Sequence, residues 1–305
     1  MTTFLARIRS EAGQAYFFVV FILTLLLGIS AMVVDVGSWY RADRHLQTAA
    51  DAAALAGAQE LPLKPSFAQS VALQYAQLNY AGSTPTVTLP NPATIHVKAE
   101  ADTPGIFAPV LNSAFKIVTV HADAEAQVSA PEQLKNAAPI AVQQDFACVV
   151  TSPSCFGKTV TADFGSDDDT DPTKGKFGLL DLDRDGRIGT SDMKNWLTNG
   201  YPDYLPINST YPPANGEKNG IKTQLQDAAR TQRVLLFPVY DTATSAGYHI
   251  IGWAAFVIDD VVKWAGPSHV LTGHFVTFIA TDLAAGNPIT DLSKDFGVHV
   301  ITLTQ

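Results

Sequence analysis

The sequence predicts an α+β protein. One long N-terminal helix, membrane-spanning and then amphipathic as in pilins, is followed by a mixed extracytoplasmic region whose C-terminal part is mainly antiparallel β. Three observations predict this fold class. Residues 15–34 carry no charge, residues 35–62 are rich in alanine with no Gly-Pro break before them, and residues 233–305 contain alternating apolar runs separated by turn-rich linkers.

Residues 15–34, AYFFVVFILTLLLGISAMVV, are predicted to span a membrane as one helix. At 1.5 Å per residue this helix rises about 30 Å, which is the hydrocarbon thickness of a bilayer. A cleaved signal peptide is the alternative, but its apolar core is usually about 7–15 residues and Ile29-Ser30-Ala31 is a poor cleavage site. Arg7 and Arg9 precede the span, so the positive-inside bias places the tail of residues 1–14 in the cytoplasm and the rest outside.

Asp35 comes one residue after the predicted hydrocarbon edge. Trp39 and Tyr40 follow at the level of an interfacial aromatic belt. A carboxylate inside a membrane can act in a relay, but the depth of Asp35 favours a position at the water interface. Asp35 and Gly37 are therefore expected to belong to the outer end of the anchor.

The alanine-rich segment is predicted to continue the same helix to about Leu61, where Pro62 and Pro65 stop it. Its small and apolar residues fall at i, i+4, i+7, i+11 and i+15, which is one stripe of a helix. Small residues let another backbone approach closely, so we expect this stripe to be a docking face for other proteins. Its members are Ala42, Leu46, Ala49, Ala53 and Gly57.

Composition and motifs exclude several function classes. The net charge is −9 and no basic patch is interleaved with aromatic residues, so nucleic acid is not an expected partner. The sequence has no G-x-S-x-G elbow, H-E-x-x-H helix or phosphate-binding glycine loop. His249, His274 and His299 lie in β runs, where a histidine is usually a packed or surface residue. We expect neither an enzyme nor a small-molecule substrate.

Beyond residue 62 the chain is expected to form three regions. Residues 63–130 read as an α/β unit that begins with a helix over 66–81. Residues 131–232 are rich in Pro, Gly, Asn and Asp and are expected to be loops with a few strands and a helix over 222–232, and residues 233–305 are β-rich. Cys148 and Cys155 lie in the loop-rich region, and outside the cytoplasm such a close pair predicts a structural disulfide.

The loop DLDRDGRIGTSD, residues 181–192, has the spacing of an EF-hand calcium loop. Asp181, Asp183 and Asp185 occupy positions 1, 3 and 5, with Gly186 at the turn. Arg187 offers its carbonyl at position 7, and Asp192 stands at position 12 in place of the common Glu. KFGLL before the loop does not look helical whereas MKNWLTNG after it does, so the loop resembles a half EF-hand as in dockerin modules.

Calcium is therefore a candidate cofactor. A weak extracellular site, with a dissociation constant of about 10⁻⁴–10⁻³ M, would staple the loop-rich region. The alternative is a solvated acidic turn, because Asp and Gly are ordinary loop residues. The neighbouring acidic residues Asp167, Asp168, Asp169 and Asp171 are expected to be a solvated charge run.

The N-terminal segment resembles TadE/TadG-like proteins of the Flp (Tad) pilus-assembly system. The residues that carry the resemblance are Gly13-Gln14 before the span, Asp35-Val36-Gly37 at its outer end, and the alanine block from Leu46 to Ala58. IHVKAEADTPGIFAPVL and VTVHADAEAQV are similar to the family's strand–short helix–strand unit.

The resemblance implies a pilin-related envelope protein in the bacterial cytoplasmic membrane, an accessory or minor component of pilus assembly or surface attachment. The lipid bilayer and other pilin-like proteins, bound through the N-terminal helix, are the implied partners. Related prepilins carry a glutamate at the fifth position after the cleaved glycine, but counting from Gly13 that position is Phe18. A permanently anchored assembly factor is therefore expected. The alternative is a calcium-dependent adhesion module tethered to the membrane.

Overall fold

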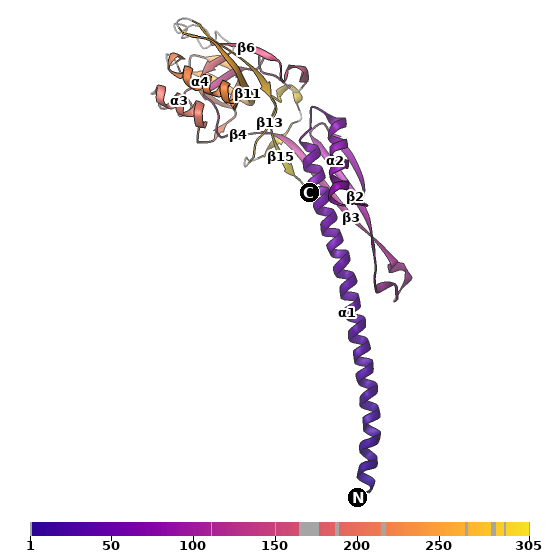
Figure 1. The fold of residues 1–305 in the computed structure, drawn as a ribbon. Coiled ribbons are helices and arrows are strands. Elements are labelled where there is room, and N and C mark those ends of the chain that lie inside the picture. Colours follow the sequence, from indigo (N-terminus) through magenta and orange to yellow (C-terminus); the bar gives the residue numbers. More distant parts are fainter. Residues whose placement is uncertain are drawn as a thin grey trace.

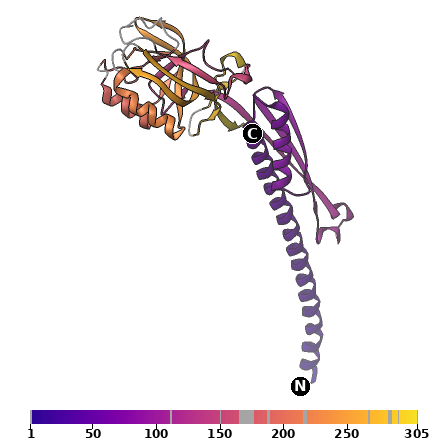
Figure 2. The same cartoon turned by 45° about the horizontal axis from the view of Figure 1, so that its top comes forward.

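The protein is described here from a computed structural model. It describes residues 2–110, 112–149, 151–164, 177–186, 189–214, 218–265, 268–281, 285–289 and 291–304. The helix α1, Thr2–Ala58, extends far beyond the rest of the chain at its N-terminal end (Figure 1). Its C-terminal part is packed against a helix and a sheet, and a second β-rich unit lies at the far end of the molecule from the N-terminus (Figure 2).

The single helix α1 confirms the continuous rod that the sequence predicts. It ends at Ala58, three residues earlier than expected, and a turn that includes the cis peptide bond Leu61–Pro62 follows. Pro65 does not stop α1; it is the first residue of α2, Pro65–Asn79, where its missing N–H has no helical partner to lose. The helix predicted over 66–81 is therefore confirmed with slightly different ends.

The first sheet packs on the C-terminal part of α1 and on α2. Its strands run in the order β1-β2-β3-β15-β13, with β14 also pairing β3, and every pair but the parallel β13–β15 is antiparallel. The long hairpin of β2 and β3 keeps one register from Thr94↔Gln127 to Pro104↔Ile117. The bounds are β1 Thr84–Asn91, β2 Thr94–Pro104, β3 Ile117–Pro131, β13 Phe278–Ile279, β14 Ala285–Pro288 and β15 Val298–Leu303.

The second sheet runs in the order β6-β12-β11-β10-β5-β7, with β9 pairing β11. Only the β5–β10 pair is parallel, so the α+β fold class with mainly antiparallel sheets is confirmed. Phe237, Phe256 and Phe275 are fully buried at its centre, and the Phe256 ring centroid lies 5.1 Å from that of Phe237 and 5.0 Å from that of Phe275. The bounds are β5 Ile140–Gln143, β6 Thr159–Asp163, β7 Phe177–Leu179, β9 Ser209–Tyr211, β10 Val234–Thr244, β11 Gly247–Ala265 and β12 Ser268–Val276.

Short elements complete the fold. β4 and β8 form a separate two-stranded sheet, and α3 and α4 lie beside the second sheet (Figure 1). The helices expected over 193–200 and 222–232 are confirmed as α3 and α4. The bounds are β4 Gln133–Leu134, β8 Leu205–Pro206, α3 Thr190–Asn199, α4 Lys222–Thr231, η1 Ala108–Val110, η2 Ser113–Lys116, η3 Pro153–Cys155, η4 Lys218–Ile221 and η5 Leu292–Lys294.

The two sheets do not coincide with the expected sequence regions. The strand β15, in the predicted C-terminal β region, pairs with β3 from Val300↔Ser129 to Leu303↔Ala126. The chain thus leaves the first sheet at β3, builds the second unit, and returns to complete the first sheet. Two cores result, one around Leu46 and Ile95 and one around Phe237 and Phe256.

Candidate functional site

The alanine stripe of α1 is buried against the chain's own first sheet and α2, except for Ala42, which is only partly buried. Leu46 and Ala53 are fully buried, Ala49 is 1% exposed, and α2 contributes Ala68, Ala72 and Ala76 to the same core. This corrects the expectation that the stripe docks other proteins. The small residues do permit close approach, but the surface that approaches them belongs to the same chain.

Gly57 marks the closest approach. A Cβ at this position would lie 2.5 Å from Ile95 Cδ1 and 2.9 Å from the carbonyl oxygen of Ala68. No side chain fits there without displacing α2 or β2. Gly37 differs, because a Cβ at position 37 would meet nothing within 4 Å. The two glycines of α1 that the sequence singles out therefore have different roles: one allows tight packing and the other faces open space.

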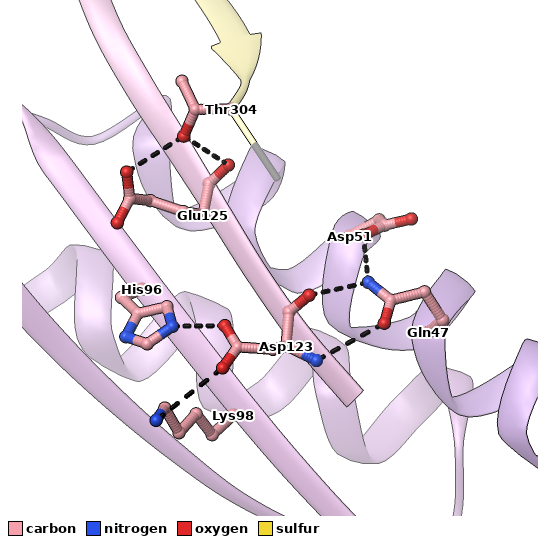
Figure 3. A network of polar contacts seen from close by, with 7 residues as sticks. All are labelled: Gln47, Asp51, His96, Lys98, Asp123, Glu125 and Thr304. Atoms are coloured by element: carbon pink, nitrogen blue, oxygen red, sulfur yellow. Dashed lines mark hydrogen bonds and ion pairs between the residues drawn. The ribbon is translucent and has the colours of Figure 1, made fainter. Parts of the chain in front are cut away.

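Gln47 fixes the register of α1 against β3 (Figure 3). Its Nε2 donates to the carbonyl oxygen of Asp123 at 2.8 Å, and its Oε1 accepts from the Asp123 N–H at 3.3 Å. Nε2 also donates to Asp51 Oδ1 at 2.8 Å. The amide thus pairs with both backbone groups of one residue on β3, as a neighbouring strand would. Gln47 is not a member of the predicted stripe, and its partner lies 76 residues away, so no local pattern reveals this contact.

The Asp123 carboxylate continues this network on the other side of β3. It accepts from His96 Nε2 and lies 3.7 Å from Lys98 Nζ, both on β2 (Figure 3). Nearby, the Thr304 N–H donates to the carbonyl oxygen of Glu125 at 2.9 Å, and its hydroxyl donates to the Glu125 carboxylate at 2.9 Å. These contacts fasten the C-terminal residues to β3 beside α1.

Asp35 clasps the tip of the β2–β3 hairpin. Its side chain is fully buried, and its carboxylate accepts from the N–H of Ile106 at 2.9 Å, of Phe107 at 2.8 Å and of Ala108. The sequence predicts that Asp35 lies at the membrane–water interface, but its carboxylate is covered by protein and does not face water. Its partners lie more than 70 residues away, so no local pattern reveals them. Trp39 packs one turn further along α1 against Phe115 of the same tip, with ring centroids 6.2 Å apart.

The part of α1 before Asp35 has no covering within the chain. Its apolar side chains from Tyr16 to Val34 are almost all exposed, and α1 is long and apolar enough to cross a membrane. In water such a surface is strongly unfavourable. The helix therefore has an exposed apolar part and a buried alanine-faced part, which meet at Asp35.

The calcium-type loop brings three of its predicted ligands together. One carboxylate oxygen each from Asp181, Asp183 and Asp185 lies within 4.8 Å of the others. The Gly186 N–H donates to Asp181 Oδ2 at 3.2 Å, and Gly186 has a φ of +70°, the turn conformation that position 6 requires. The strand β7 precedes the loop and α3 follows it, as in the predicted half EF-hand.

The remaining predicted ligands do not join this cluster. Asp192 lies in the first turn of α3 and is outside the group of three, as far as the described residues go. Arg187 falls outside the described residues, as do Asp167, Asp168, Asp169 and Asp171.

Burial distinguishes Asp181 from the other two carboxylates. Asp181 is 1% exposed, whereas Asp183 and Asp185 are exposed. Loss of solvation, followed by the hydrogen bond to Asp183, raises the pKa of Asp181 to about 6. A bound cation would offset this cost, because its charge favours the ionised carboxylate. The chemistry of the loop thus fits a hard cation such as calcium.

The two cysteines form the predicted disulfide. Cys148 and Cys155 are seven residues apart with a Cα–Cα distance of 5.7 Å. The three histidines of the β runs each pair with an aspartate: His249 with Asp241, His274 with Asp259, and His299 with Asp295. His299 and Asp295 are both buried, so this pair is a packed structural contact.

Together these features define a class of protein in which one long helix carries an α+β region. The N-terminal part of this helix is apolar and exposed, and its C-terminal part packs against the α+β region. Comparison with known families then supports a narrower description. The family described as "Putative Flp pilus-assembly TadE/G-like" matches residues 13–60, which is the segment that carries the resemblance. The match supports a pilus-assembly-related protein. Comparisons with curated proteins and with solved structures yield no match.

Proposed function

We propose that the protein is a membrane-anchored, pilin-related component of the bacterial cell envelope, with an accessory or minor role in Flp (Tad) pilus assembly or surface attachment. The observation that carries the proposal is the division of α1. Residues 16–34 expose apolar side chains, while residues 46–58 bury theirs against α2 and the first sheet. A lipid bilayer is the environment that satisfies the exposed part.

The proposed orientation puts residues 1–14 in the cytoplasm and the sheets outside. Arg7 and Arg9 before the span support it through the positive-inside bias. The disulfide between Cys148 and Cys155 supports it independently, because disulfides persist in oxidising compartments outside the cytoplasm.

The proposed partners contact the apolar part of α1. The alanine stripe is occupied within the chain, so the surface left for other pilin-like helices is the exposed part before Asp35. Phe18 stands where related prepilins carry a glutamate, which favours a permanently anchored assembly factor over a processed fibre subunit.

A calcium-dependent binding role is the alternative proposal. The convergence of the Asp181, Asp183 and Asp185 carboxylates supports calcium at the β7–α3 loop. In this alternative the second sheet binds a glycan or protein, and the helix merely tethers it.

Complementation of a deletion strain separates the two proposals. Removing residues 233–305 is unsuitable, because it would also remove β15 from the first sheet. Better variants are Leu26→Arg, which places a charge in the span, and Asp183→Asn with Asp185→Asn, which alters two exposed loop positions. The assembly proposal predicts that the span variant loses surface pili while the loop variant keeps them. Normal piliation with the span variant, together with lost calcium-dependent attachment in the loop variant, would support the tethered module instead.

A further inference from the structure

The tip of the β2–β3 hairpin, described over residues 105–110 and 112–116, lies beside the exposed apolar part of α1. Both ribbon views show the end of the hairpin extending along α1 toward the N-terminus, beyond the rest of the first sheet (Figures 1 and 2). Phe107, Ala108 and Val110 of the tip share an apolar groove with Gly28, Ala31 and Met32 of α1. A Cβ at Gly28 would meet nothing within 4 Å, so the tip borders this part of α1 without packing tightly against Gly28.

The groove lies inside the predicted membrane span. Gly28 precedes Val34, the last residue of the span, by six positions, which is about 9 Å along a helix. The tip therefore reaches about a third of the way into a hydrocarbon layer of about 30 Å. Because the tip is fastened to α1 by Asp35 and by the Trp39–Phe115 contact, this depth is fixed by the fold.

The exposed surface of the tip is largely apolar, although the polar residues Asn112 and Ser113 are also exposed. Val110 is 87% exposed, Ile106 is 63% exposed, and Phe107 and Phe115 are close to half exposed. The charged residue of the tip, Lys116, lies at its neck, where its carbonyl oxygen accepts from the Gly105 N–H at 3.2 Å. An apolar end with a lysine at the neck matches an acyl layer below a phosphate layer.

Most of the described backbone N–H groups of the tip have a hydrogen-bond acceptor. Pro104 and Pro109 have no N–H, and Asp35 accepts three of the remaining donors. Acceptors within the tip serve the N–H groups of Gly105, Val110, Asn112, Ala114 and Phe115. Irregular backbone is costly in lipid unless its polar groups are paired. A surface loop in water would not need this degree of pairing.

The hydrogen bonds from the hairpin tip also bury Asp35, whose charge would otherwise interrupt the apolar surface of α1 between Tyr16 and Tyr40. From Tyr16 to Tyr40, all of which the structure describes, the single ionisable residue other than the tyrosines is Asp35, and it is fully buried. The helix surface without an exposed charge is thus about 36 Å long. This exceeds the hydrocarbon thickness, so the tip lies at or below the outer membrane–water interface.

We propose that the hairpin tip is a second membrane-embedded element, which inserts Ile106, Phe107 and Val110 among the acyl chains of the outer leaflet while Asp35 holds it to α1. The inference rests on the proposed anchoring by α1. Its occupant is phospholipid, because the exposed side chains continue the bare apolar surface of the span. The protein is thus held by two elements, which restrain the tilt and rotation of the sheets above the membrane.

Site-directed labelling of the full chain in phospholipid nanodiscs tests the proposal. Both natural cysteines are in the disulfide, so a new cysteine is the sole thiol. An environment-sensitive fluorophore is attached to Val110→Cys, to Leu26→Cys in the span, and to Leu78→Cys on α2, which is 72% exposed and remote from the tip. Quenching by nitroxide groups on lipid acyl chains is compared with quenching by aqueous iodide.

The proposal predicts that the labels at positions 110 and 26 are quenched at least several-fold more by lipid nitroxide than by iodide, and that the label at 78 shows the reverse. Lipid quenching at 26 with iodide quenching at 110 would overturn insertion of the tip while leaving the anchor intact. Iodide quenching at 26 would overturn the anchor itself. Shielding of position 110 from both quenchers would identify protein, and not lipid, as the occupant.

A separate measurement tests whether the Asp35 carboxylate holds the hairpin tip against α1. Asp35→Asn keeps the size of the side chain but replaces one accepting oxygen with an NH₂ group, which faces backbone donors. The anisotropy of the label at Val110→Cys is expected to fall in this variant. Ser38→Ala is the control, because its hydroxyl donates to the backbone carbonyl oxygen of Asp35 at 2.8 Å and not to the carboxylate. Unchanged anisotropy of this label in Asp35→Asn would contradict the claim that Asp35 holds the tip to α1.

Discussion

A methyl group added at Gly57 tests whether the alanine-faced part of α1 packs as described. In Gly57→Ala the new Cβ would lie 2.5 Å from Ile95 Cδ1, 2.9 Å from the Ala68 carbonyl oxygen and 3.0 Å from Ala72 Cβ. The Ile95 side chain can move away from the new methyl group, but the contact at Ala68 is with a backbone atom, which cannot move without shifting α2. Overpacking of this kind costs about 1–3 kcal/mol. Alanine also gains up to about 1 kcal/mol of helix propensity, and less near a helix end. The net expected destabilisation is about 1–2 kcal/mol.

Gly37→Ala is the matched control, because it makes the same substitution on the same helix. No atom lies within 4 Å of the new methyl group, so only the helix propensity changes. We expect this variant to be as stable as the original protein or more stable by up to about 1 kcal/mol.

Native-state amide hydrogen exchange of the full chain in nanodiscs measures both variants. A loss of 1–2 kcal/mol makes exchange roughly 5- to 30-fold faster for amides of α2 and β2 that open with this core. Gly57→Ala should show this acceleration, and Gly37→Ala should not. Equal protection in the two variants would refute close packing of α1 against α2 and β2.

Three further predictions concern the two cores and the loop. Leu46→Ala should destabilise the first core by about 2–5 kcal/mol in denaturant unfolding, while exposed Leu78→Ala should change stability by less than about 0.5 kcal/mol; similar losses would contradict the buried position of Leu46. Replacing both Cys148 and Cys155 with alanine should cost about 2.4 kcal/mol, the loop-closure entropy of a seven-residue separation, and unchanged unfolding would argue against the bridge. Calcium affinity should fall below about pH 6, because Asp181 takes up a proton there. The calcium-free protein should lose stability as the pH rises from about 4 to 6, because the folded state holds this proton more tightly than the unfolded state. Calorimetric titration that showed constant calcium affinity from pH 7 to 5 would contradict the raised pKa of Asp181.

The long helix and its apolar part follow from the sequence with little ambiguity. An uncharged run of this length and a stripe of small residues are local patterns, and the structure confirms both as one helix. The close approach at Gly57 is likewise implied by its place on the stripe. The identity of the surface that packs there is not, because α2 and β2 come later in the chain and no periodicity in α1 encodes them.

Long-range contacts limit what the sequence reveals about the site. Asp35 reads as an interfacial carboxylate until the Ile106–Ala108 turn is brought to it from across the hairpin. Gln47 reads as a solvated residue until β3 lies beside it. The return of β15 to the first sheet is also invisible locally, since its alternating pattern fits either sheet equally well. The calcium-type loop is different, because its candidate ligands Asp181, Asp183 and Asp185 lie within a few residues of one another and their convergence follows from spacing alone.

The central claim is that one helix is embedded in lipid by its N-terminal part and carries the folded sheets outside the cytoplasm. Alkaline carbonate extraction of membranes from the native bacterium, combined with thiol labelling of the two cysteines, tests it most directly. The account predicts that the full-length chain stays with the membranes and that Cys148 and Cys155 react only after reduction. Recovery of the full-length chain in the cytosol with both thiols free would contradict it.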